Sequence, residues 1–140
     1  MTNNEIGSLI YATAFSDGMP APLCSLIEAQ SKHETGLYTS HAFKKNNNCF
    51  GYKYVKGSKW QDAPGITSTE GNPYAKYKTI ENSVHELCAW VGRRQKEKKF
   101  PKDLTIITEP EQYASLLKIC AYYGDPLKNY INGLTHYLKN

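Results

Sequence analysis

The sequence lacks the features that mark several common protein classes. The N-terminal stretch MTNNEIGSLIYATAF contains neither a basic leader nor a long apolar run, so we expect no signal peptide and no membrane span. The 4 histidines show no HExxH or paired-ligand spacing, which argues against a metal site. There is no Gly-rich phosphate loop and no nucleophile elbow. No sequence motif indicates a cofactor, so we expect none.

Charge of either sign is modest. The 17 basic and 13 acidic residues leave a formal net charge of +4, which does not indicate a dedicated nucleic-acid-binding protein. The most basic stretch is RRQKEKKFPK at 93–102, and a solvated helix end explains it, because basic last turns complement the helix dipole. The functional alternative is docking to an anionic polymer. DNA binding through this stretch predicts a steep salt dependence.

The cysteines are too far apart in the sequence for metal-binding pairs. Cys24, Cys49, Cys88 and Cys120 each lie beside apolar residues, and no CxxC spacing occurs. We therefore expect free, buried thiols. A fold built in this way does not need an oxidising compartment.

Length and tyrosine content narrow the protein class. A chain of 140 residues with 40% hydrophobic residues is long enough for one globular domain, 1–140, with its own core. Tyrosine is unusually frequent, with 11 Tyr against 4 Phe and 2 Trp. Rings with polar tips suit carbohydrate grooves, and they suit protein interfaces equally well.

Apolar residues at helical spacing predict about five helices. Helix-start signals accompany most of them, as capping-box spacings or as prolines near the first turn. The starts are at Thr2–Glu5, at Pro22, near Thr79, at Thr108–Glu111, and at Asp125 as an N-cap before Pro126.

The middle third of the chain predicts strands. Residues 50–54 alternate aromatic with small or polar residues, and 59–62 and 65–70 supply one or two further short strands. Turns are expected at Gly57-Ser58 and at 71–73. The stretch before them, TSHAFKKNNNC, has no helical period and predicts a polar loop near a cleft. The fold class is α+β, mainly helical with a β-rich lobe at about 49–77.

The helix over 22–36 places a carboxyl where helices disfavour one. Glu34 falls in the last turn, where the negative end of the helix dipole opposes a carboxylate. That field and any partial burial raise the pKa of the side chain toward a proton donor near neutral pH. A solvated last-turn residue is the plain alternative, and position alone favours it.

Five segments, in order, resemble a known family. IEAQSKHETG followed by NNCFGYK is similar to the AQ…ESG…N-FG-K signature of the endo-β-N-acetylglucosaminidase domain of bacterial autolysins and flagellar peptidoglycan hydrolases. STE at 68–70, YAKYKTIENS at 74–83 and YYGDP at 122–126 resemble the later segments of that family. The resemblance spans about 22–136. It implies a lysozyme-like fold with a substrate cleft between a helical lobe and a small β lobe.

The resemblance also implies catalytic roles. Glu34 matches the general acid, which protonates the glycosidic oxygen. Glu70 matches a second carboxylate that stabilises the transition state or positions water, and Asp62 is the alternative. Tyr122 matches a tyrosine that lines the cleft near the acid. His33 departs from the family pattern and is interpreted as a helix-face residue with a local hydrogen bond.

Further residues are expected to bind the sugar chain. Asn48 and Phe50 match an Asn-x-Phe-Gly pattern, in which Gly51 allows close backbone approach. Tyr123 replaces Tyr122 if the register slips by one. Other aromatic side chains are candidates for stacking on sugar rings, although some of them must be core: Tyr52, Tyr54, Trp60, Tyr74 and Tyr77.

The resemblance implies a peptidoglycan hydrolase that cleaves β-1,4 bonds of glycan strands, most simply after N-acetylglucosamine. A muramidase or a lytic transglycosylase shares the first protonation step, so both stay open. A non-catalytic wall-binding or virion structural module is the alternative of a different class. No nucleic acid or membrane partner is expected, and the protein is a monomer or part of a larger assembly. The localisation stays open, since an autolysin or phage lysin acting on the wall needs delivery by phage, lysis or a secretion system.

Overall fold

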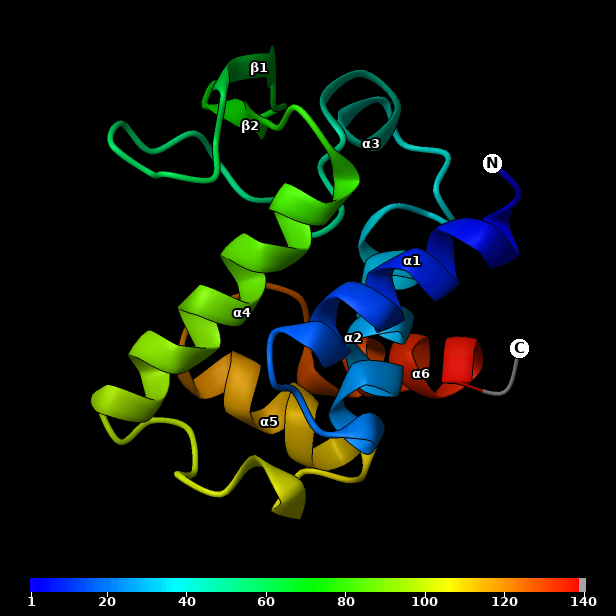
Figure 1. Cartoon of the computed structure of the whole chain (residues 1–140), viewed down its shortest axis with the longest axis vertical. Helices are drawn as coiled ribbons and strands as arrows, with labels where there is room; N and C mark the ends of the chain where they lie inside the picture. The colour runs from blue at the N-terminus through cyan, green and yellow to red at the C-terminus, as the bar shows by residue number, and fades with distance from the viewer. Residues whose placement is uncertain (139–140) are drawn as a thin grey trace.

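The computed structural model describes residues 1–138 and contains the five long helices that the sequence predicts. A short helix, a two-stranded sheet and one 3-10 turn complete it (Figure 1). In chain order the elements are α1 (Asn3–Ser16), α2 (Ala21–Glu34), α3 (His41–Asn46), β1 (Ala63–Thr67), β2 (Pro73–Lys76), α4 (Ile80–Lys96), the 3-10 turn η1 (Leu104–Ile106), α5 (Pro110–Ile119) and α6 (Leu127–Leu138).

The helix starts follow the predicted caps closely. In the box before α1, Thr2 N donates to Glu5 Oε1 at 2.9 Å and Glu5 N donates to Thr2 Oγ1 at 3.1 Å. Thr79 caps α4 through a hydrogen bond from Asn82 N at 3.1 Å. These signals are local, so the sequence alone reveals them.

Two helix starts differ from the prediction by one residue. At α5 the returning side chain is Gln112 rather than Glu111: its Oε1 accepts from Thr108 N at 2.8 Å and from Glu109 N at 3.0 Å. Helix α6 begins at Leu127, and Pro126 O accepts the first turn's hydrogen bond. Asp125 therefore stands before the helix, and its carboxylate is exposed to solvent.

Helix α2 is the central element of the helical lobe. It packs on α1 and α6, and its buried Leu23, Leu26 and Ile27 meet core residues from α4, α5 and α6. The contact with α6 depends on a glycine, because a side chain on Gly133 would overlap the His33 ring. His33 thus packs against α6, with its ring edge-on to Tyr130 at 4.8 Å.

The small lobe consists of α3, β1 and β2, which gather near the start of α4 in Figure 1. The strands are antiparallel, with Ala63 opposite Lys76 and Thr67 opposite Pro73, and a bulge lies between Pro64 and Thr67. Helix α3 packs on both strands, and Asn46 O accepts from Tyr77 N at 2.8 Å. The lobe therefore begins earlier in the chain than its strands do.

Three local predictions in this lobe are wrong. The stretch predicted as a polar loop contains α3, which Ser40 caps and left-handed Asn47 ends. Six residues are too few to show a helical period. Residues 50–54 form no strand, only an isolated bridge between Lys53 and Tyr74, and 59–62 form none. Gly51 turns the chain there with φ of 75°, which breaks the alternation of strand geometry.

All four cysteines are free, as predicted. Cys24, Cys49 and Cys88 are buried, whereas Cys120 is half-buried. Burial raises the pKa of the Cys24 thiol to about 11 and that of Cys49 to about 12, so both stay protonated at neutral pH. In the part of the chain that the structure describes, every helix is too short or too polar to cross a bilayer.

Candidate active site

A cleft of about 770 Å³ lies between the helical lobe and the small lobe. The end of α2 and the segment 120–125 form one wall, and the segment 50–53 with Glu70 and Tyr74 forms the other. Seven of the side chains that the sequence proposes for the site line this cleft: Glu34, Phe50, Tyr52, Glu70, Tyr74, Tyr122 and Tyr123.

Glu34 is the last residue of α2, and a left-handed turn follows it. Thr35 N bonds to Ser31 O, and Gly36, Leu37 and Tyr38 all have positive φ, between 57° and 64°. The turn is held by Tyr38, whose backbone N donates to Thr35 Oγ1 at 2.8 Å. This abrupt reversal leaves the Glu34 side chain at the cleft wall, as the glycine in the sequence predicts.

The Glu34 carboxyl has no hydrogen-bond or ion-pair partner among residues 1–138. The Glu34 side chain is half-buried, and its surroundings raise the pKa of its carboxyl to about 8. Burial is the larger cause, because it removes water from the charged form, and the negative charge of Asp125 adds to it. Glu34 is therefore mostly protonated at pH 7, at about ten to one.

Glu70 lies across the cleft in a different environment. Its side chain is 77% exposed, and Lys53 Nζ is 3.9 Å from its Oε1. The same ammonium lies over the Tyr74 ring, 3.9 Å from the centroid. Asp62, the alternative second carboxylate, does not line the cleft and instead pairs with Lys78 at 3.7 Å.

Tyr122 connects the two walls. Its hydroxyl donates to Phe50 O at 3.1 Å, and its ring meets those of Tyr52 and Trp90 edge-on at 5.8 and 5.2 Å. Burial raises the pKa of the Tyr122 phenol well above its ordinary value, and an ionised Glu34 would raise it further. Tyr122 and Glu34 line the same cleft.

Tyr123 has a packing role as well as a place in the lining. It stacks on Tyr130 of α6 with the centroids 3.8 Å apart, and its hydroxyl donates to Ala114 O at 3.0 Å. These contacts anchor the segment 120–125 on the helical lobe. Tyr123 therefore lines the cleft together with Tyr122.

The segment that faces Glu34 is shaped by a buried asparagine. Asn48 Nδ2 donates to Tyr52 O and Ala75 O, both at 2.9 Å, and its Oδ1 accepts from Gly51 N at 2.9 Å. A Cβ placed on Gly51 would lie 3.9 Å from Glu34 Oε2, so the backbone passes close to the acid. Asn48 acts on the cleft through this backbone and does not line it.

A family model described as mannosyl-glycoprotein endo-beta-N-acetylglucosaminidase, Glucosaminidase, matches residues 12–140. The chain belongs to the glucosaminidase family. Its fold is similar to that of the glycoside hydrolase domain of FlgJ from Salmonella typhimurium, with a TM-score of 0.65 and 22% sequence identity over 99% of this chain and 87% of that one. No curated protein sequence matches the chain.

These findings confirm the resemblance to the family and the lysozyme-like α+β fold. They also make the chain a glycoside hydrolase, as the sequence predicts.

Tyr77, a predicted stacking platform of this glucosaminidase, is a core residue. Its side chain is 1% exposed and its hydroxyl donates to Glu86, so no sugar ring reaches it. Tyr54 does not line the cleft, and Trp60 lines a second cavity. Sequence spacing does not separate these tyrosines from Tyr74, because the fold decides which ring faces outward.

The cleft also contains residues that sequence reasoning missed. Asp125 supplies a carboxylate close enough to raise the pKa of Glu34, although the sequence suggests only an N-cap. Lys53 and Trp90 also line the cleft. The one available signal was the position of Asp125 two residues after the tyrosine pair of YYGDP. Within residues 1–138, no group of three or more His, Cys, Asp or Glu side chains is placed to hold a metal ion.

Proposed function

We propose that this glucosaminidase cleaves the β-1,4-glycosidic bonds of peptidoglycan, after N-acetylglucosamine, with Glu34 as the general acid. The observation that carries the proposal is the unpaired Glu34 carboxyl, whose pKa is raised to about 8 at the wall of a cleft between two lobes. A poor leaving group such as a sugar oxygen needs a proton, and a carboxyl that is neutral at pH 7 supplies one.

The opposite wall supplies the complementary charge. Positive charge develops on the sugar ring during cleavage. A carboxylate on the opposite side of the ring can stabilise this charge, or it can activate the water that attacks the ring. Glu70 is exposed on that wall, with Lys53 Nζ 3.9 Å from its Oε1. Asp125 lies on the same wall as Glu34, and we assign it the task of keeping Glu34 protonated.

Aromatic side chains and backbone provide the sugar-binding surface. Tyr52 and Tyr74 line the cleft with their rings half-exposed, which suits the apolar faces of sugar rings. Tyr122 closes the cleft beside Glu34 by its hydrogen bond to Phe50 O. Asn48 keeps the Gly51 backbone close to the acid.

The test compares the wild-type chain with Glu34→Gln on purified sacculi. The released fragments are reduced and identified by mass spectrometry, which shows which sugar carries the new reducing end. We expect N-acetylglucosamine ends from the wild type and a rate lower by at least about 100-fold in the variant. Glu111→Gln is the matched control, because Glu111 is an exposed carboxylate outside the cleft.

Each of the other outcomes indicates a different function for this protein. N-Acetylmuramic acid ends indicate a muramidase, and anhydro ends indicate a lytic transglycosylase on the same scaffold. Binding of sacculi by both chains without cleavage indicates a wall-binding module. Equal activity of the wild type and Glu34→Gln removes Glu34 from the mechanism.

A further inference from the structure

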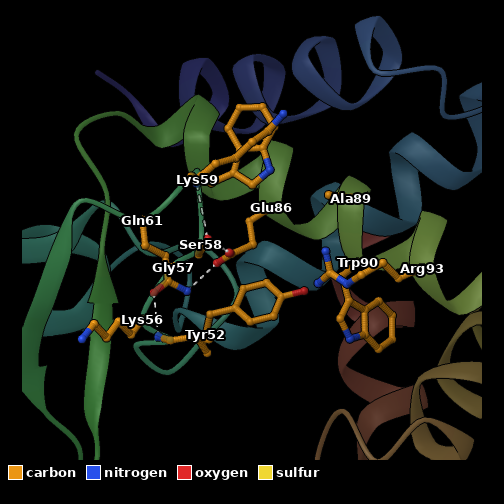
Figure 2. A pocket seen from close by; sticks show the side chains of 12 residues that line it. Tyr52, Lys56, Gly57, Ser58, Lys59, Gln61, Glu86, Ala89, Trp90 and Arg93 are labelled. Atoms are coloured by element: carbon orange, nitrogen blue, oxygen red, sulfur yellow. Dashed lines mark hydrogen bonds between the residues drawn. The ribbon is translucent and has the colours of Figure 1, made fainter.

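A second cavity, of about 680 Å³, lies next to the cleft, between α4 and the segment 55–61 (Figure 2). The segment 55–61 forms one side of it and α4 the other. Tyr52 and Trp90 line both the cleft and this cavity, so the two spaces share a wall. A substituent of a chain bound in the cleft that extends past Tyr52 and Trp90 would reach the second cavity.

The cavity is built around a buried carboxylate that neutral donors saturate. Glu86 Oε1 accepts from Tyr77 and from Gln61 Nε2 at 2.8 Å, and its Oε2 accepts from Ser58 Oγ. Gln61 in turn accepts from Val55 N at 2.8 Å (Figure 2). These bonds attach the segment 55–61 to α4, so the cavity exists before a ligand arrives.

The remaining charges of the lining are positive. Lys56, Lys59 and Arg93 stand against the single buried Glu86, whose oxygens are already occupied. Arg93 is exposed and has no carboxylate partner among residues 1–138. Figure 2 shows it beside Trp90, with the Tyr52 hydroxyl directed toward it. An unpaired guanidinium beside aromatic walls is suited to binding a carboxylate through two parallel hydrogen bonds.

We propose that this cavity binds a carboxylate of the short peptide that hangs from the glycan strand, with Arg93 as its ion-pair partner. The assignment rests on the proposed function, because the peptide is the part of peptidoglycan that carries free carboxylates. The sugar rings of the strand carry no negative charge that could pair with Lys56, Lys59 and Arg93. Glycan therefore occupies the cleft, and its peptide extends over Tyr52 and Trp90 toward Arg93.

Tryptophan fluorescence tests the proposal directly, because both tryptophans of the chain line this cavity. The probes are two synthetic stem peptides without sugar, one with free carboxylates and one in which these are amidated. We expect saturable quenching by the free acid, with binding at least about tenfold tighter than that of the amide. Arg93→Gln should remove this difference, and Arg93→Lys should restore part of it.

Lys96→Gln is the matched control, since Lys96 is an exposed cation three residues further along α4 that does not line the cavity. An equal loss in Lys96→Gln and Arg93→Gln overturns the proposal in favour of general charge attraction. Equal binding of acid and amide, or no quenching, also overturns it. The titration needs no cleavage, so a chain that binds the acid without cutting sacculi refutes the enzymatic function alone.

Discussion

Replacing Glu34 with glutamine should make the protein more stable, by an amount that depends on pH. The folded pKa of about 8 lies above the ordinary value of 4.5, so folding favours the protonated carboxyl. Its contribution to stability is complete below about pH 4.5 and is lost as the pH rises through about 8. Glutamine cannot ionise, and it escapes this loss.

The two pKa values determine the size of the effect. Between pH 4.5 and 8 the free energy of unfolding of the wild type falls by about 1.4 kcal/mol for each pH unit. The reason is that in this range the carboxyl is ionised in the unfolded chain and protonated in the folded one. The gain of Glu34→Gln in free energy of unfolding should be under about 1 kcal/mol at pH 5 and about 3 kcal/mol at pH 7. It levels off at about 5 kcal/mol above pH 9.

Urea unfolding of both chains at pH 5, 7 and 9, followed by circular dichroism, measures this difference. Glu111→Gln controls for loss of an exposed carboxylate and should show no comparable rise with pH. A gain that is the same at all three pH values, or a variant less stable than the wild type at pH 9, would refute a buried neutral Glu34. The expected result is that Glu34, the proposed general acid, lowers the stability of the fold at neutral and alkaline pH.

Three further predictions concern the rest of the cleft. Asp125→Asn should move the alkaline limb of the pH–rate profile to lower pH, because the variant lacks the negative charge that helps to raise the pKa of Glu34. The move should be less than half of the rise in that pKa from 4.5 to about 8, because burial is the larger cause of the rise. Initial rates measured between pH 5 and 9 test this. Glu70→Gln should lower turnover on sacculi at least about tenfold, whereas Asp62→Asn, outside the cleft, should change it less than about twofold. Tyr122→Phe removes one hydrogen bond between the cleft walls and should lower turnover about tenfold while the chain stays folded by circular dichroism.

Controls and contrary results apply to each of these. Glu111→Gln removes one charge without touching the cleft, so an alkaline limb that moves equally there would mean a net-charge effect. Full activity of Glu70→Gln eliminates Glu70 as the second carboxylate. Unchanged turnover of Tyr122→Phe limits that hydroxyl to a minor structural contact.

Short-range signals made most of the helical lobe predictable. The capping box at Thr2–Glu5, the cap at Thr79 and the glycine after Glu34 act within a few residues, so they are legible without the fold. The same holds for the apolar spacing of α4 and α6. At the start of α5, two neighbouring polar residues, Glu111 and Gln112, could each close the capping box. The prediction of Glu111 was off by one residue, because Gln112 closes the box.

The small lobe was less predictable because long-range hydrogen bonds shape it. Asn48 binds the carbonyl of Ala75, 27 residues away, and Glu86 holds the segment 55–61 from 25 and 28 residues away. Such contacts override the alternation of apolar and polar residues that predicts a strand over 50–54. They also explain why Tyr77 is buried while Tyr74 faces the cleft.

The sequence by itself determined the residues proposed to carry the chemistry: a glutamate at the end of a helix, a second glutamate between the two strands and a late tyrosine. Only the tertiary structure decided that Glu34 is left without a partner, that Asp125 stands near it, and that Asp62 points elsewhere. The reason is that a carboxyl's proton affinity depends on the water and charges removed or added around it by distant segments. A helix position can bias that affinity, but the meeting of α2 with the segments 50–53 and 120–125 sets it.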